Sequence, residues 1–409
     1  MQRFDVVVIG SGALGSSAAF HLARRGQSVA LVDQAAIGSQ TSPRAAGLSG
    51  QVRRNPVMAA LARRSVEKIQ RFTAETGQPM TYHQPGSMNV ARTERHKVQL
   101  EKTAAYGRSL GFDIDLISPG EAHERMPFLQ TSGVLAVTHM RTDVFLEPWQ
   151  IPTGYARASQ ALGAVTMPDT QVLSLVVEDG AVARVVTDKG ELAADAVVDA
   201  AGGWTRLVAA MAGAVTPMVP MRHQLMVTEP IPGVSNNQPI VRIIDTNVYV
   251  RPDRGGLMLG GYERDPTPVD LTKAGPGFRI ENLALDLDVL RRLAADVEAQ
   301  FPIFQTAPLR EHRGGLPTMT PDGEHIVGPA PGVKGLYILG GCNVGGLSIS
   351  PALGEELARW IVTGAPSVDL SRMSPARFTT ELSASDLFEA CKARYANYYS
   401  PPATVGAAY

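Results

Sequence analysis

The chain has 409 residues, of which 44% are hydrophobic, and a formal net charge of -1 at pH 7. This length allows one large or two ordinary domains with sizeable cores. The near-neutral charge offers no electrostatic attraction to nucleic acid or to an anionic membrane. The two cysteines, Cys342 and Cys391, are too few for a disulfide framework, which suits a reducing compartment. With no signal peptide before the first strand and no apolar run that spans a bilayer, we expect a cytoplasmic protein.

Residues 6–33, VVVIGSGALGSSAAFHLARRGQSVALVD, predict a nucleotide-binding βαβ unit. Gly10 allows a tight turn, Gly12 lets backbone amides approach a pyrophosphate, and Gly15 lets the helix pack closely on the strand. Asp33, about 20 residues beyond the glycines, can accept hydrogen bonds from a ribose and would repel a ribose phosphate. The unit therefore predicts a dinucleotide other than NADP.

The next part of the chain is predicted to be a polar loop followed by helices. Residues 34–56 are too rich in Gly, Ser and Pro for a regular element. Amphipathic helices are expected at 57–75 and 92–112, and Ser118 with Glu121 fits the capping box of a short helix.

The middle of the chain changes to a β pattern. Residues 171–200 contain short β-branched segments separated by turn signals. Alternating segments at 219–228 and 247–262 predict a second, mainly antiparallel sheet. The fold class expected is α/β, with a Rossmann-like domain interleaved with a smaller α+β domain.

The final third contains a second glycine-rich turn. A strand at Leu336–Leu339 leads into Gly340–Gly341, then Gly345–Gly346, and a helix is expected from about Pro351. Two distant glycine-rich turns indicate that separate parts of the chain approach one extended ligand. This favours a dinucleotide with a bulky reactive end.

Five motifs together resemble the flavin amine-oxidoreductase family, which includes glycine oxidase, D-amino-acid dehydrogenases, sarcosine oxidase and dimethylglycine dehydrogenase. They are GSGALG with Asp33, TSPRAAG, VVDAAGGWT, GLPTMTPDGEHIVG and YILGGCNVGGLSISPALG. The resemblance implies FAD as cofactor and oxidation of a carbon–nitrogen bond. It also implies a discontinuous FAD-binding domain (1–80, 150–215 and 315–372), a substrate domain (81–149 and 216–314) and a C-terminal tail (373–409).

The resemblance assigns the cofactor contacts residue by residue. They are Gly10, Ser11, Gly12, Ala13, Leu14, Gly15, Asp33, Gln34, Ser42, Arg44, Ala45, Ala46, Gly47, Leu48, Val172, Ala201, Gly202, Trp204, Gly341, Asn343, Gly345, Gly346 and Leu347. Backbone amides of the last group would stabilise negative charge at the pyrimidine edge of a reduced flavin. Gly315 and Arg44 stand where relatives carry the cysteine or histidine that links the flavin covalently, so non-covalent FAD is expected.

Two further departures from the family narrow the activity. Pro317 replaces the arginine with which glycine oxidase clamps a carboxylate, which disfavours a primary α-amino acid. Met258 is expected where sarcosine oxidase places a lysine that assists the reaction with oxygen. A dehydrogenase is therefore favoured over an oxidase, with a quinone, an electron-transfer protein or oxygen as the electron acceptor.

Candidates for binding the substrate come from the polar loop at 34–56 and from the second sheet. Arg53, or the adjacent Arg54, is placed to hold a carboxylate, unless both face solvent. Tyr249 matches the glycine oxidase tyrosine that faces the substrate, and Arg251 lies two residues on, hence on the same strand face. The alternative is a packing tyrosine with a structural ion pair.

His223 and His325 complete the candidates, although a lone histidine is more often structural. No metal-ligand or Ser-His-Asp constellation is apparent. Tyr395, Tyr398 and Tyr399 in the tail either cover a pocket, dock on another subunit or belong to a loose end.

The function expected is FAD-dependent oxidation of an amino acid or secondary amine, with N-methyl or cyclic amino acids favoured. A hydride passes to the flavin and the imine is then hydrolysed. Alternatives are a D-amino-acid dehydrogenase or oxidase, a pyridine-nucleotide dehydrogenase, and a partner-dependent β-type subunit of a heteromeric amine oxidoreductase. The expected partners are the amine and the electron acceptor, and a homo- or hetero-oligomer is possible.

Overall fold

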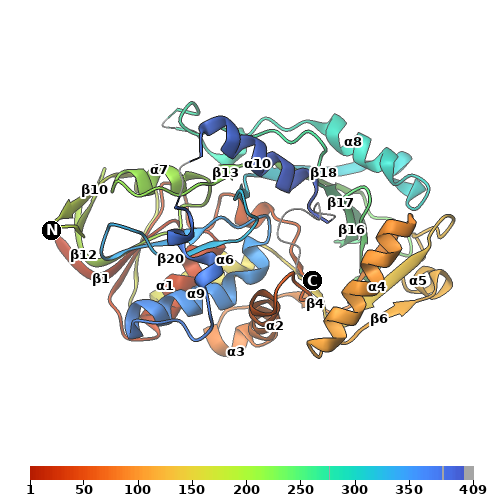
Figure 1. Ribbon diagram of the computed structural model, residues 1–409, viewed down its shortest axis with the longest axis horizontal. Coiled ribbons are helices and arrows are strands. Elements are labelled where there is room, and N and C mark those ends of the chain that lie inside the picture. The colour runs from red at the N-terminus through yellow and green to blue at the C-terminus, as the bar shows by residue number, and fades with distance from the viewer. Residues whose placement is uncertain (276, 380–381, 400–409) are drawn as a thin grey trace.

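Two eight-stranded sheets lie at opposite ends of the computed structural model (Figure 1), which describes residues 1–275, 277–379 and 382–399. The first sheet contains β10 (Val172–Glu178), β11 (Ala181–Thr187), β12 (Gly190–Asp199), β1 (Gln2–Ile9), β2 (Val29–Val32), β9 (Val165–Met167), β21 (Leu336–Gly340) and β20 (Ile326–Pro329). The second contains β18 (Leu309–Gly315), β14 (His223–Thr228), β17 (Gly256–Gly261), β16 (Val248–Asp253), β15 (Ile240–Ile243), β5 (Ser87–Ala91), β7 (Ala136–Met140) and β6 (Ile114–Ile117).

Small sheets and helices complete the architecture. The small sheets are β3 (Leu48–Ser49), β8 (Val144–Leu146) and β4 (Tyr82–His83), and β13 (Val219–Pro220) with β19 (Thr318–Met319). The helices are α1 (Ala13–Ala23), α2 (Pro56–Gln70), α3 (Phe72–Thr76), α4 (Glu94–Ser109), α5 (Pro119–Arg125), α6 (Gln150–Ala161), α7 (Thr205–Ala210), α8 (Leu287–Asp296), α9 (Gly346–Thr363) and α10 (Ala384–Ala396).

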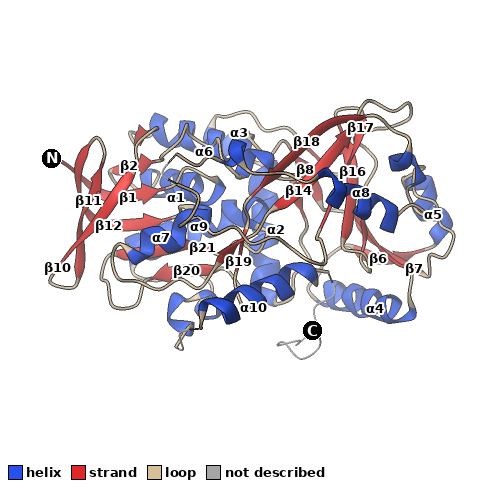
Figure 2. Cartoon of the chain, turned by 90° about the horizontal axis from the view of Figure 1, so that it is seen from above, coloured by secondary structure: helices blue, strands red, loops and turns tan. Residues whose placement is uncertain are grey.

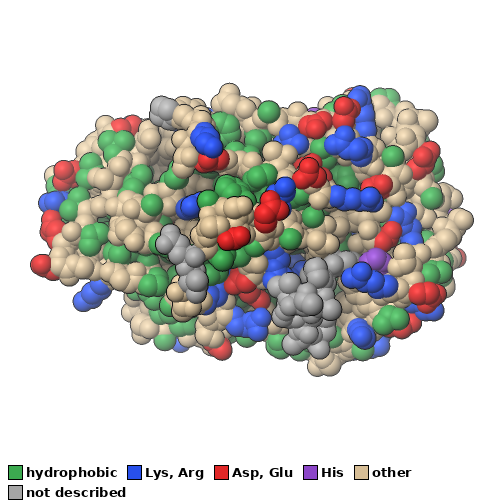
Figure 3. Space-filling view, turned by 45° about the horizontal axis from the view of Figure 1, so that its top comes forward, with side chains coloured by type: hydrophobic (Ala, Val, Ile, Leu, Met, Phe, Trp, Pro, Cys, Tyr) green, Lys and Arg blue, Asp and Glu red, His purple; other side chains and the backbone are tan. Residues whose placement is uncertain are grey.

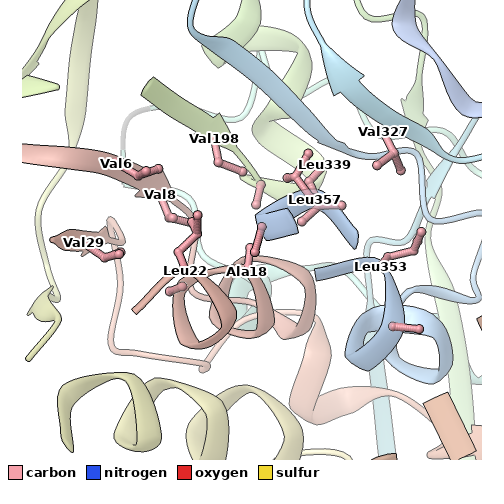
Figure 4. Close-up of a cluster of buried hydrophobic side chains, with 14 of the residues drawn as sticks. Val6, Val8, Ala18, Leu22, Val29, Val198, Val327, Leu339, Leu353 and Leu357 are labelled. Atoms are coloured by element: carbon pink, nitrogen blue, oxygen red, sulfur yellow. The ribbon is translucent and has the colours of Figure 1, made fainter. Parts of the chain in front are cut away.

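The first sheet has a parallel core buried on both faces. β1 pairs in parallel with β2 and β12, and β12 pairs in parallel with β21. Because side chains alternate along a strand, Val6 and Val8 join the cluster with α1 and α9 shown in Figure 4, while Val7 and Ile9 pack on the opposite face. Burial on both faces explains why β1 reads as a continuous apolar run.

Gly15 allows α1 to lie directly against the first turn. A methyl group at Gly15 would come 1.9 Å from the carbonyl oxygen of Gly10. No L side chain fits at that distance, so the close packing of α1 depends on glycine.

Helix α9 begins at Gly346, so the prediction of a start near Pro351 was wrong. Pro351 lies inside the helix and cannot donate to the carbonyl of Leu347. The hydroxyl of Ser350 donates to that carbonyl instead, at 2.9 Å. This substitute bond lets the helix extend one turn further toward its N-terminus.

The second sheet is antiparallel except between β5 and β15. Its strands come from two separate stretches of the chain, and those of the first sheet come from three. The predicted fold class, an interleaved Rossmann-like part and a mainly antiparallel part, is confirmed. The domain boundaries themselves stay a prediction.

Other predicted elements appear with shifted ends. The helix expected at 57–75 is divided into α2 and α3, and Ser118 caps α5 by accepting from the Glu121 amide at 3.1 Å. Helix α10 packs against β13 and β19 (Figure 2).

Charges of both signs are interspersed on the face in Figure 3. Within the described ranges, every helix is too short or too polar to cross a membrane.

Candidate active site

One cavity of about 580 Å³ is lined by residues of both large sheets. It connects the first glycine-rich turn with the second and reaches α10. The residues proposed from sequence that line it are Gly10, Gly12, Ala13, Leu14, Asp33, Gln34, Ser42, Arg44, Ala45, Ala46, Gly47, Leu48, Arg53, Val172, Ala201, Gly202, Trp204, His223, Tyr249, His325, Asn343, Gly345, Gly346 and Leu347.

Four proposed residues, Ser11, Gly15, Gly341 and Arg251, are not among the lining residues. Ser11 lies behind Asp33 and donates to it through both its amide and its hydroxyl, at 2.7 and 2.6 Å. Gly341 has φ +60°, and a methyl group there would come 2.6 Å from Thr320 Cγ2. Ser11, Gly15 and Gly341 thus shape the turns around the cavity.

The first turn presents backbone amides and one carboxylate to the cavity. Gly10 has φ +97°, which L side chains rarely adopt. The Asp33 carboxylate is held in place by Ser11 and by the Ala35 amide at 2.8 Å. Burial raises the pKa of Asp33 overall, against the Ser11 and Ala35 hydrogen bonds that lower it.

The second turn has an unusual backbone. Asn343 and Val344 have φ +42° and +64°, and a β-branched residue in the left-handed region is a rare, strained conformation. The Asn343 side chain stabilises the turn, because its amide donates to Gly341 O at 2.7 Å and its oxygen accepts from Thr320 N at 3.0 Å. Such strain is typical of loops that form a binding site.

The charges around the cavity fit an anionic dinucleotide. The first turns of α1 and α9 contain no acidic side chain, so the partial positive charge of both N-termini is uncompensated. Ala13 and Leu14 of α1 and Gly346 and Leu347 of α9 line the cavity. A pyrophosphate at one helix and the anionic edge of a reduced flavin at the other would match these positive ends.

Arg251 has a structural environment. Its Nε donates to Ala46 O at 2.7 Å, its Nη1 lies 3.2 Å from Asp253 Oδ1, and its guanidinium packs over the Phe145 ring at 4.8 Å. Burial lowers the pKa of Arg251 to about 10, opposed by Asp253. Arg251 is therefore a packing residue that joins β16 to the loop containing Ala46, and the prediction that it binds the substrate is withdrawn.

Tyr249 and His223 form a hydrogen-bonded pair at the cavity wall. His223 Nε2 lies 3.0 Å from the Tyr249 hydroxyl, and Nδ1 lies 2.6 Å from the hydroxyl of Tyr395 on α10. The Tyr395 hydroxyl donates to Arg222 O at 3.3 Å. It must therefore accept from Nδ1–H, which leaves Nε2 to accept from Tyr249. Burial lowers the pKa of His223 to about 4, so the ring is neutral at pH 7.

Arg53, Arg54 and His325 lie together at another part of the wall. Both arginines line the cavity, so the alternative that both face solvent is wrong. Arg53 donates to Ser348 Oγ at 3.1 Å, and Arg54 donates to Tyr398 O at 3.1 Å. His325 is buried, and among the described residues neither of its ring nitrogens has a hydrogen-bond partner. Burial, reinforced by the nearby charge of Arg53, lowers the pKa of His325 to about 3.

Met258 does not face the cavity, contrary to the expectation from sequence. It is fully buried in a cluster with Tyr249 and Tyr262 and is absent from the cavity lining. The argument for a dehydrogenase that rested on Met258 therefore falls. Gly315 and Pro317, the other positions that depart from the family pattern, do line the cavity.

Sequence reasoning missed four charged residues of the cavity lining, Asp143, Arg242, Glu324 and Arg394, and did not place the tail. Arg242 on β15 and Asp143 both line the cavity. A single arginine inside the apolar stretch PIVRII was a signal that was available but not used. Tyr398 and Tyr399 line the cavity near Tyr262, and Tyr398 stacks on the Tyr262 ring with centroids 4.1 Å apart. Residues 400–409 of the predicted tail lie outside the described residues.

The fold and the cavity together define a dinucleotide-binding protein with a second, substrate-facing sheet. The model of the family "FAD dependent oxidoreductase" matches residues 5–360. The chain belongs to this FAD-dependent family.

Similar proteins and solved structures align with most of this chain. Mouse mitochondrial dimethylglycine dehydrogenase is 30% identical over 393 residues, which cover 92% of this chain and 44% of that protein. The mouse mitochondrial pyruvate dehydrogenase phosphatase regulatory subunit is 27% identical, covering 91% and 43%. The L-proline dehydrogenase structure from P. horikoshii matches with a TM-score of 0.83 and 26% identity, covering 92% of this chain and 98% of that one. The chain spans less than half the length of these two mouse relatives.

Proposed function

We propose that the protein oxidises the carbon–nitrogen bond of an N-methyl or cyclic amino acid. The observation that carries the proposal is the Tyr249–His223 pair, which lines the same cavity as both nucleotide-binding turns. The names of two relatives, dimethylglycine dehydrogenase and L-proline dehydrogenase, support this substrate class and favour a dehydrogenase.

FAD, when bound, would accept the hydride that leaves the carbon next to nitrogen and that carries both electrons of the oxidation. The chain's residues prepare the amine. Because the Tyr249 hydroxyl donates to His223, its oxygen keeps a lone pair to accept from the substrate N–H. Because burial lowers the pKa of His223 to about 4 and keeps the ring neutral, the proton of the ammonium form goes to water rather than to the Tyr249–His223 pair. The neutral amine is the form that can lose a hydride and become an imine.

Aromatic rings face the position where positive charge develops. His223, Tyr249 and Tyr262 line the cavity, with the His223 and Tyr262 centroids 5.1 Å apart. The negative π faces of these rings stabilise an iminium carbon–nitrogen bond without a fixed counter-charge. A neutral His223 adds no repulsion to that charge.

The test is anaerobic mixing of the FAD-loaded protein with N,N-dimethylglycine, sarcosine and L-proline while the flavin absorbance is followed. Bleaching by one of these supports the proposal. Failure of all three, with bleaching by a D-amino acid, would transfer the assignment to that class.

A second candidate function is that of a partner-dependent subunit. It is favoured by the match to a regulatory subunit and by coverage of less than half of the mouse relatives. Its signature would be bound FAD that no amine reduces until a second polypeptide is added.

A further inference from the structure

An arginine outside every recognised motif faces the cavity beside Tyr249. Arg242 lies on β15, where the register pairs it with Tyr249 of β16 and Asn89 of β5. Residues directly opposite each other in a sheet share one face, with Cβ atoms about 5 Å apart. All three line the cavity. Arg242 and Tyr249 therefore share one sheet face and one cavity, with the Tyr249 hydroxyl directed over Gly260 of β17.

A buried carboxylate fixes the surroundings of Arg242. A methyl group on Gly50 would lie 3.2 Å from Asp143 Oδ2 and 3.5 Å from Arg242 Nη2, so the two groups meet over this glycine. Asp143 is only 3% exposed. It accepts from Gln51 N at 2.9 Å and from the Ser87 hydroxyl at 2.6 Å. Asp143 is thus held by its own hydrogen bonds and acts on Arg242 through its charge.

The charges here are not balanced. Burial raises the pKa of Asp143, while Arg242 and, more weakly, Arg53 oppose this shift and favour its ionised form, so two cations face one carboxylate. Among the described residues, Arg242 takes part in no ion pair within 4.0 Å. Arg53 already donates to Ser348 Oγ. Arg242 is half-buried and has a hydrogen bond with the Tyr399 side chain, which leaves its positive charge uncompensated. A cation partly withdrawn from water favours an anion beside it, and Arg242 lies on the same sheet face as Tyr249.

We propose that Arg242 binds the carboxylate of the amino-acid substrate and that Asp143 positions its guanidinium. The inference rests on the proposed function and deepens it. With the carboxylate on β15 and the amine at Tyr249 on β16, the site selects a free carboxylate close to the nitrogen. Amines that lack a carboxylate would be poor ligands.

The experiment measures binding without turnover. The FAD-loaded protein is titrated with methoxyacetate, an N-methyl amino acid analogue that cannot be oxidised at nitrogen, and with neutral methoxyacetamide, while the flavin spectrum is followed. Loss of a charge-assisted bidentate contact weakens binding by about 10- to 100-fold. Arg242→Gln should therefore raise the Kd for methoxyacetate by that factor and change the Kd for the amide less than about threefold.

Matched variants separate binding from folding. Arg264→Gln removes an exposed arginine with a side chain 80% accessible and should leave both Kd values unchanged. Arg242→Lys keeps the charge and should give an intermediate Kd, which decides the matter if Arg242→Gln loses its flavin. Asp143→Asn should lower the preference for carboxylate over amide, a ratio that a merely structural role would not move.

Two outcomes would overturn the proposal: no preference of the wild-type protein for methoxyacetate over the amide, or full retention of that preference in Arg242→Gln. The proposed function fails separately. If methoxyacetate binds through Arg242 but no N-methyl or cyclic amino acid bleaches the flavin, the binding site stands and the reaction is wrong.

Discussion

The hydroxyl of Tyr395 lies 2.6 Å from Nδ1 of His223. Tyr395 is on α10, 172 residues along the chain from His223 at the start of β14. The C-terminal helix thereby sets which His223 nitrogen carries the proton. This tautomer leaves Nε2 free to accept from Tyr249 at the cavity wall.

Tyr395→Phe removes the hydroxyl that accepts from Nδ1–H of His223, so the tautomer of His223 is no longer fixed. We expect the rate of flavin reduction to fall by about fivefold, since one net hydrogen bond corresponds to about 1 kcal/mol. FAD affinity should not change, because Tyr395 does not line the cavity. Tyr337→Phe on β21 is the control. An unchanged rate in anaerobic stopped-flow measurements would show that α10 is only structural support.

Stability should fall as the pH drops below about 6.5, because burial lowers the pKa of His223 to about 4 and that of His325 to about 3. An unfolded histidine has a pKa near 6.5, so below that pH the unfolded state binds more protons. Between pH 6.5 and 4.5 each histidine contributes a loss on the order of 2 kcal/mol.

His325→Leu isolates one part of this pH dependence. Because neither ring nitrogen has a hydrogen-bond partner in the part of the chain that the structure describes, the substitution should change the free energy of unfolding at pH 7 by no more than about 1 kcal/mol. Urea denaturation at pH 7, 5.5 and 4.5 should show a shallower loss than in the wild type. An identical slope would mean that His325 is not buried in the neutral form.

Gly15→Ala should prevent FAD binding and destabilise the fold by more than about 3 kcal/mol, because the new methyl group would meet Gly10 O. Gly120→Ala is the matched control, since its nearest contact would be Ser118 Oγ at 3.9 Å. In a helix this change is neutral or stabilising by up to about 1 kcal/mol. Thermal unfolding and FAD fluorescence check both variants, and a stable, FAD-loaded Gly15→Ala would contradict the packing of α1.

Arg251→Met tests the structural assignment of that residue. Breaking the buried pair with Asp253 should cost about 3 kcal/mol of stability. The KM for the amino acid should change less than about threefold, in contrast to Arg242→Gln. A large rise in KM with normal urea stability would return Arg251 to the substrate site.

The nucleotide-binding part of the fold was predictable because its signals are local. Gly10, Gly12, Gly15 and Asp33 lie within one βαβ unit, where spacing alone determines their positions. The start of α9 was not predictable in this way, since Pro351 is a helix breaker and its compensation by the Ser350 hydroxyl depends on a side-chain rotamer.

The substrate side depends on contacts between distant segments. Strand alternation places Tyr249 and Arg251 on one face, but Asp253 and Ala46 O hold the Arg251 guanidinium away from the cavity. Arg242 reaches the site through strand pairing with Tyr249, which no local pattern encodes. The contact of Tyr395 with His223 is likewise formed only by the packing of α10.

The most direct measurement is anaerobic titration of the FAD-loaded protein with N,N-dimethylglycine, sarcosine and L-proline, followed by exposure to air. We predict that at least one of them bleaches the flavin band, that Tyr249→Phe slows the bleaching, and that reoxidation in air is slow, as expected for a dehydrogenase. A flavin that none of these compounds reduces, even at saturating concentration, would contradict the proposed oxidation of N-methyl or cyclic amino acids by this chain alone.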